Sequence, residues 1–132
     1  MRLLYPLAIS AFLLVGCANN QQSDALKAEA QRTTPQCQSD DECQVMWSAA
    51  RRWVLSNAGT KIQNYGADYL DTYNPIANSP RLAAQVSKDA IGSGKYQIIA
   101  KLWCDNIFGC QPGAWEALVD FNRSGNTAAG KH

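Results

Sequence analysis

The sequence is poor in the residues that most often build catalytic sites. Among 132 residues it has a single histidine, His132, at the last position. One histidine there argues against a Ser/His/Asp or Cys/His nucleophile and excludes a histidine-rich metal site. No glycine-rich phosphate-binding motif occurs either, because Gly92-Ser93-Gly94 is better explained as a hairpin turn. We therefore expect no metal and no cofactor.

The chain also lacks an excess of charge of either sign. It has 12 basic and 11 acidic residues, which gives a formal net charge of +1. Loss of residues 1–16 would remove Arg2 and leave equal numbers of both signs. A neutral chain has no electrostatic reason to bind nucleic acid or anionic lipid, so no nucleic-acid partner is expected.

A hydrophobic run long enough to cross a membrane is missing as well. The longest apolar stretch, Leu3–Val15, follows Arg2 and is interrupted by Pro6 and Ser10. A spanning helix needs about 20 apolar residues, whereas this length is typical of the apolar part of a signal peptide. The stretch ends in Leu14-Val15-Gly16-Cys17, and this segment resembles the lipobox of bacterial lipoproteins.

The resemblance, which covers only residues 1–17, has definite implications. It implies that residues 1–16 are a signal peptide cleaved after Gly16, and that Cys17 carries a diacylglycerol on its thiol and an acyl chain, such as palmitate, on its amino group. Ala18, in place of the aspartate that retains lipoproteins in the inner membrane, implies an outer-membrane protein facing the periplasm. Several acyl chains are sufficient for stable anchoring, because one chain alone binds a membrane only marginally.

Composition divides the remaining chain into three parts. Residues 17–36 are rich in Asn, Gln, Ser, Thr and Ala and contain no aromatic residue, which predicts a flexible tether. Residues 37–123 contain all four tryptophans and predict a single small domain. Residues 124–132 are rich in Gly, Ala and Asn and predict a frayed tail.

Two helices are predicted at the two ends of this domain. Ser39 and Glu42 form a capping box before an apolar stripe at helical spacing, which predicts a helix that ends near Asn57. Pro112 suits the first turn of a second helix. The stripe of that helix is made by Ala114, Ala117, Leu118 and Phe121.

Three antiparallel strands are predicted between the helices. The first is a long strand over residues 61–73 with a bulge at Gly66, and the others cover residues 82–87 and 96–102 around the turn at residues 92–94. The sequence thus predicts an α+β fold: helix, three-stranded antiparallel sheet, helix, with both helices on one face.

Four cysteines other than Cys17 predict two disulfides in an exported domain. Five residues separate the cysteines of each neighbouring pair, which does not suit a zinc site. Cys43 falls on the apolar stripe of the first helix and Cys104 on the buried parity of the third strand. This favours Cys43–Cys104 and Cys37–Cys110 over the local pairings Cys37–Cys43 and Cys104–Cys110.

Two surfaces are candidate binding sites. The first is the loop pinned between Cys104 and Cys110, with Trp103, Asp105, Asn106 and Phe108. The second is the sheet face that the helices leave open. The alternation of side chains along the strands places Ile99, Trp103, Tyr69 and Tyr73 on this face. Each also has a structural explanation, since the loop could cap the core and the aromatic residues could pack across strands.

These features favour a non-enzymatic lipoprotein that binds an envelope protein or cell-wall partner. Two alternatives stay open at this point. One is an enzyme acting on peptidoglycan or another glycan through Asp105 or Asp71, which two facing carboxylates would favour. The other is an inhibitor of host hydrolases, which a protruding pinned loop would favour.

The lipobox generates the first testable prediction. Mass spectrometry of the mature protein should show an N-terminal Cys17 that carries acyl groups, because the cysteine follows the apolar stretch directly. The mass increment should disappear in Cys17→Ser. An unmodified mature N-terminus in the wild-type protein would contradict the prediction.

Overall fold

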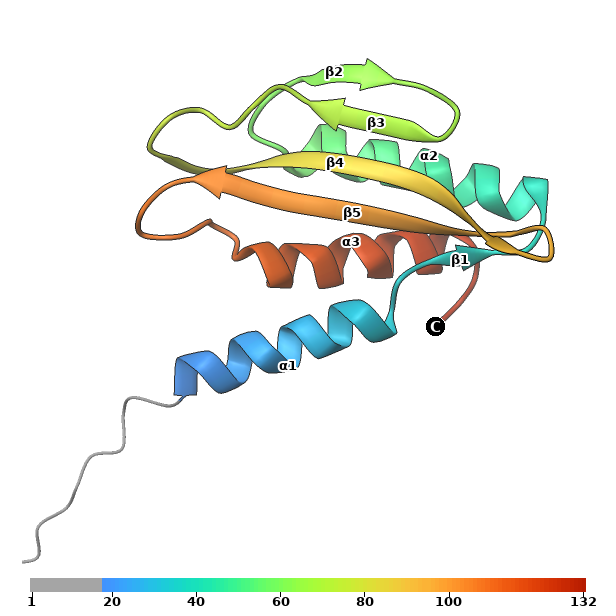
Figure 1. Cartoon of the computed structure of the whole chain (residues 1–132), viewed down its shortest axis with the longest axis horizontal. Coiled ribbons are helices and arrows are strands. Elements are labelled where there is room, and N and C mark those ends of the chain that lie inside the picture. Colours follow the sequence, from blue (N-terminus) through green and yellow to red (C-terminus); the bar gives the residue numbers. More distant parts are fainter. Residues whose placement is uncertain (1–17) are drawn as a thin grey trace, which may run out of the picture.

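The computed structural model describes residues 18–132, so the expected signal peptide and Cys17 lie outside the described residues. The fold is α+β, with three helices and a five-stranded antiparallel sheet in the order β1-β5-β4-β3-β2 (Figure 1). Along the chain the elements are α1 (Ala18–Arg32), β1 (Gln36–Cys37), α2 (Asp40–Asn57), β2 (Ile62–Tyr65), β3 (Tyr69–Thr72), β4 (Ser79–Gly92), β5 (Lys95–Asp105) and α3 (Ala114–Ala128).

The first predicted helix is confirmed as α2, including its cap. The Ser39 hydroxyl accepts a hydrogen bond from the Glu42 backbone N–H at 3.2 Å, and the Glu42 carboxylate accepts one from the Gln38 N–H. Both bonds satisfy donors that a helix start leaves without partners. Trp47 and Trp53 lie on the buried stripe, as predicted.

One hydrophobic core lies between the sheet and two helices. Helices α2 and α3 contact each other and cover the same face of the sheet (Figure 1). The predicted placement of both helices on one face is therefore confirmed. On this face β4 and β5 contribute every second residue to the core, namely Leu82, Ala84, Val86, Ile98 and Ala100.

The segment predicted as one bulged strand is a hairpin. Strands β2 and β3 pair antiparallel, and the Gly66 N–H donates to the Tyr69 carbonyl across the turn at 2.8 Å. The bulge occurs instead between Ile62 and Asn64. Gly66 thus marks a turn, and the hairpin lets β3 pair with β4 as well as with β2.

The predicted flexible tether at residues 17–36 is wrong over its described part. Helix α1 packs on α3, and Ala30 is buried in that contact. The packing is largely polar, because the buried Asn122 amide donates to the Ala30 carbonyl at 2.8 Å and to the Thr33 hydroxyl at 3.3 Å. Such a polar contact cannot be predicted from the spacing of apolar residues in the sequence.

Two elements extend past the expected boundaries at residues 37 and 123. Strand β1 begins at Gln36, one residue before the expected boundary, and pairs with β5. Helix α3 continues to Ala128, and Lys131 Nζ donates to the Gln36 carbonyl at 2.7 Å and to the Glu42 carboxylate at 2.8 Å. The Lys131 ammonium lowers the pKa of Glu42, chiefly through this hydrogen bond.

The presence of two disulfides is confirmed, but the predicted pairing is wrong. The bonds join Cys37 to Cys43 and Cys104 to Cys110. Cys37 lies opposite Tyr96 at the beginning of β5, and Cys104 lies eight residues further along that strand. At about 3.4 Å per residue the separation is about 27 Å, far beyond the reach of a disulfide.

The α1–α3 contact generates the second prediction. Asn122→Ala should lower the free energy of unfolding by about 1–3 kcal/mol, because it leaves the Ala30 carbonyl without its buried partner. Urea denaturation measures the change. Asn57→Ala is the matched control, because its amide also bonds a carbonyl but is exposed, and it should cost less. Equal costs would contradict this role for Asn122.

Candidate functional site

The face of the sheet opposite the helices is left open by every described element. Its side chains follow from the register, because residues directly opposite each other in antiparallel strands point to the same side. Tyr69, Ser87 and Ile99 form one cross-strand row, and Asp71, Gln85 and Lys101 form the next. The third row pairs Ala83 with Trp103. Below, these rows are called the open face.

Aromatic and polar groups alternate across this open face. Tyr69 and Ile99 are partly exposed, Trp103 is half-buried, and Tyr73, just beyond β3, is 53% exposed. The structure thus brings Tyr69, Ile99 and Trp103 onto one face, as the parity predicted. Ala83 is fully buried beside Trp103, so the indole also covers part of the sheet.

The polar row at the centre of the open face is held by internal contacts. The Asp71 carboxylate accepts hydrogen bonds from the Asn64 N–H at 3.1 Å, the Asn64 amide at 2.9 Å and the Tyr69 hydroxyl at 2.9 Å. At the other end of this row, Lys101 Nζ lies 5.6 Å from the centre of the Trp103 ring. These contacts fix the orientation of the charged groups between the aromatic side chains.

The loop between Cys104 and Cys110 is the second predicted site. Asn106 organises it: its carbonyl oxygen Oδ1 accepts from the Phe108 N–H at 2.8 Å, and its Nδ2 donates to the Asn78 carbonyl at 2.8 Å. Asp105 is exposed at the end of β5. Phe108 is 92% exposed and its neighbour Ile107 is 91% exposed. The loop therefore protrudes instead of capping the core.

The geometry does not make Asp71 and Asp105 a catalytic pair. Asp71 lies two strands from Lys101, which is about 10 Å, and Asp105 is four residues beyond Lys101, about 13 Å along β5. The two carboxylates are thus about 16 Å apart, whereas glycosidase pairs are about 5–9.5 Å apart. Among residues 18–132 no group of three or more His, Cys, Asp or Glu side chains is arranged to hold a metal ion.

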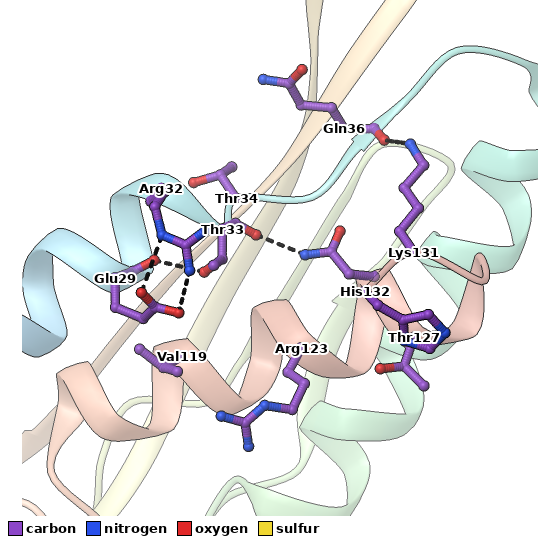
Figure 2. A pocket seen from close by; sticks show the side chains of 11 residues that line it. Glu29, Arg32, Thr33, Thr34, Gln36, Val119, Arg123, Thr127, Lys131 and His132 are labelled. Atoms are coloured by element: carbon purple, nitrogen blue, oxygen red, sulfur yellow. Dashed lines mark hydrogen bonds and ion pairs between the residues drawn. The ribbon is translucent and has the colours of Figure 1, made fainter.

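A groove of about 660 Å³ that the sequence did not reveal lies between the end of α1, β1 and α3 (Figure 2). Arg32, Arg123, Lys131 and His132 line it, so it gathers basic side chains. A sequence signal for it was absent, because these residues come from opposite ends of the chain.

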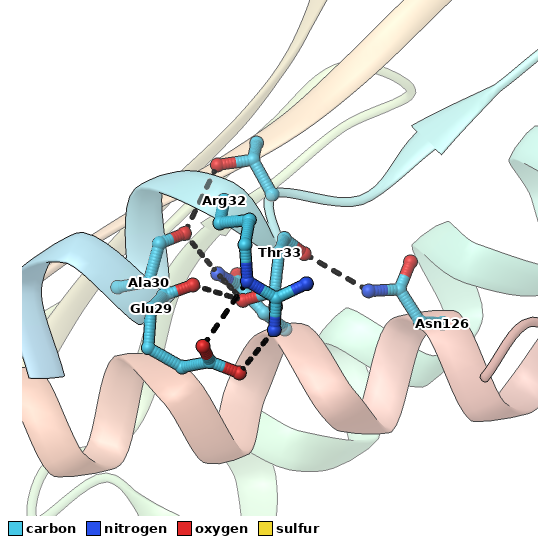
Figure 3. Close-up of polar contacts among 7 residues, drawn as sticks. Glu29, Ala30, Arg32, Thr33 and Asn126 are labelled. Atoms are coloured by element: carbon cyan, nitrogen blue, oxygen red, sulfur yellow. Dashed lines mark hydrogen bonds and ion pairs between the residues drawn. The ribbon is translucent and has the colours of Figure 1, made fainter.

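Most polar groups of this groove are used to hold α1 in place. Arg32 donates to the Glu29 carboxylate at 2.7 Å, and the Thr33 hydroxyl donates to the Glu29 carbonyl (Figure 3). Asn126 donates to the Thr33 carbonyl at 2.9 Å. With Lys131 bonded to Gln36 and Glu42, the groove is mainly the seam where the chain termini join the domain.

Comparison of the chain with protein family models, with curated proteins and with solved structures finds no match.

The Asp71–Tyr69 contact generates the third prediction. The carboxylate accepts a hydrogen bond from the phenolic hydroxyl, which stabilises the protonated form and raises the pKa of Tyr69 above its ordinary value near 10. Asp71→Asn should lower that pKa, as measured by ultraviolet titration of tyrosinate, with Tyr69→Phe identifying the signal. A raised pKa contributes stability that is complete below pH 10 and is lost as pH rises through the folded-state value. Identical titrations of Asp71→Asn and wild type would contradict the assignment.

Proposed function

We propose that this protein is a bacterial lipoprotein, anchored through Cys17 in the outer membrane and facing the periplasm, that serves as a non-enzymatic binding or accessory protein for an envelope partner. The lipobox-like segment Leu14–Cys17 supports the anchor. The two disulfides agree with an oxidising compartment outside the cytoplasm. Within residues 18–132, no helix has the length and apolar character needed to span a bilayer.

The observation that carries the binding role is the open face of the sheet. Tyrosine and tryptophan are enriched in protein interfaces because they combine large apolar area with a polar group and few rotatable bonds. Here Tyr69, Tyr73 and Trp103 occur together with Gln85 and the internally bonded Asp71. A partner would meet polar groups that are already oriented, which reduces the entropy lost on binding.

Site-specific photo-crosslinking tests this role, and it is the fourth prediction. A photoreactive residue in place of Gln85, on the open face, should give a discrete covalent adduct with one envelope protein in intact cells. The same residue in place of Gln44, which is exposed on α2, is the matched control and should give none. Adducts of equal yield at both positions would contradict a specific partner on the open face.

Trp103→Ala should reduce the yield of this adduct while leaving the protein folded. Trp103 is half-buried on the open face, whereas Trp53 is 6% exposed and its indole N–H donates to Asp120 at 2.8 Å. The melting temperature should therefore fall less in Trp103→Ala than in Trp53→Ala. A larger fall for Trp103→Ala would assign the indole a structural role instead.

A further inference from the structure

The pinned loop displays its apolar side chains on a fixed backbone. Ile107 and Phe108 are more exposed than any other large hydrophobic side chain in the described chain. Their backbone is held by the Cys104–Cys110 disulfide and by the hydrogen bond from the Gly109 N–H to the Asn106 carbonyl at 3.1 Å. A loop so held presents hydrophobic groups to water permanently, which soluble surfaces ordinarily avoid.

A second loop is joined to the pinned loop and carries another exposed apolar residue. The loop between β3 and β4 carries Ile76, which is 56% exposed, and it is joined to the pinned loop by the Asn106–Asn78 hydrogen bond. Behind this bond, the Gln111 N–H donates to the Pro80 carbonyl at 2.9 Å. The two loops thus form one body, which is called the apolar tip below and is made by Ile76, Ile107 and Phe108.

The two loop segments that carry the apolar tip contain no charged side chain, although Arg81 and Asp105 flank them. Residues 73–80 and residues 106–115 include no Asp, Glu, Lys or Arg, although charged residues make up 17% of the chain. Moving a charge into a bilayer is costly, so an uncharged end suits contact with lipid. Trp115, partly exposed at the start of α3, adds the amphipathic ring that is typical of the membrane interface.

The apolar tip lies at the end of the molecule from which the lipid anchor would extend. Both loops, the start of α3 and the start of α1 are at one end of the sheet (Figure 1). Lys27 of α1 lies over the Trp115 ring at 5.6 Å. Ala18, which follows Cys17 directly, is nine residues earlier and thus about 13 Å further along the helix axis. The chain therefore reaches beyond α3 on the side of the apolar tip.

We propose that the apolar tip inserts into the interface of the lipid bilayer that holds the Cys17 lipid. This inference rests on the proposed lipid anchor and adds an orientation to it. The anchor keeps the tip beside the bilayer, so insertion is an intramolecular step and a small apolar surface is sufficient. In this orientation one end of the sheet contacts the membrane. The open face is then directed parallel to the membrane plane, toward its partner.

Tryptophan quenching by lipid tests the insertion, and it is the fifth prediction. The lipidated chain with Phe108→Trp is reconstituted into vesicles of phosphatidylethanolamine and phosphatidylglycerol, with and without brominated acyl chains. Bromine quenches only indoles that reach the acyl region. The added fluorescence, measured against wild type, should be quenched at least twofold. Ile91→Trp is the matched control, because Ile91 is an exposed isoleucine beside the β4–β5 turn at the opposite end, and it should not be quenched.

A second variant separates insertion from a local effect of the new indole. Ile76→Trp should also be quenched, and the added changes Ile107→Ser and Phe108→Ser should abolish that quenching while the melting temperature stays within a few degrees. Equal quenching of Phe108→Trp and Ile91→Trp, or none in either, would overturn the inference. The inference would also be overturned if a soluble hydrolase, and not lipid, shielded the indole introduced at position 108. Failure of the proposed anchor is distinguishable, because an unacylated Cys17 appears in the mass spectrum before reconstitution.

Discussion

The pairing of β4 with β5 is the constraint on which the rest of this structure depends. The two long strands run from Ser79 to Gly92 and from Lys95 to Asp105 around a tight turn, and every other part of the sheet is added to them. Gly92 and Gly94 have φ of 96° and 73°, values that side-chain-bearing residues rarely adopt, so this turn requires glycine. A register fixed in this way assigns Leu82, Val86 and Ile98 to one face, and it leaves the opposite face open.

The elements that could be predicted from the sequence are those whose burial is periodic. Helix α2 has a capping box and an apolar stripe, and the β4–β5 hairpin has alternating residues on both sides of a glycine turn. Helix α1 could not be predicted in the same way. Its contact with α3 depends on Asn122 and Asn126 bonding to backbone carbonyls, and on the absence of a side chain at Gly125, where an added Cβ would approach Pro35 Cγ to 3.2 Å.

A single misassigned turn accounts for the wrong disulfide pairing. If residues 61–73 formed one strand, three antiparallel strands would follow α2. The last strand would then end beside the start of α2. The hairpin at Gly66 adds one strand and so reverses the direction of β5. The beginning of β5 therefore lies beside Cys37 and Cys43, and Cys104 lies at the far end. Side-chain parity was predicted correctly for Cys43, which is buried, but parity carries no information on strand direction.

The two candidate surfaces differ in whether the alternation of side chains along a strand is sufficient to locate them. Parity is sufficient to place Tyr69, Ile99 and Trp103 on the open face, because the register converts sequence alternation directly into position. The apolar tip needs the tertiary structure, since nothing in residues 73–80 or 106–115 shows that Ile76 and Phe108 share one end.

Both disulfides join cysteines that are close in sequence, so the loop at the apolar tip can adopt its conformation independently of the core. Each bond spans six residues in sequence, for which chain entropy provides about 2 kcal/mol, whereas the long-range pairing would have provided about 4 kcal/mol per bond. Neither bond connects distant elements, so the packing of α2 and α3 on the sheet carries the global stability. Cys104–Cys110 instead fixes one loop, which lets Ile107 and Phe108 remain exposed without loss of the core.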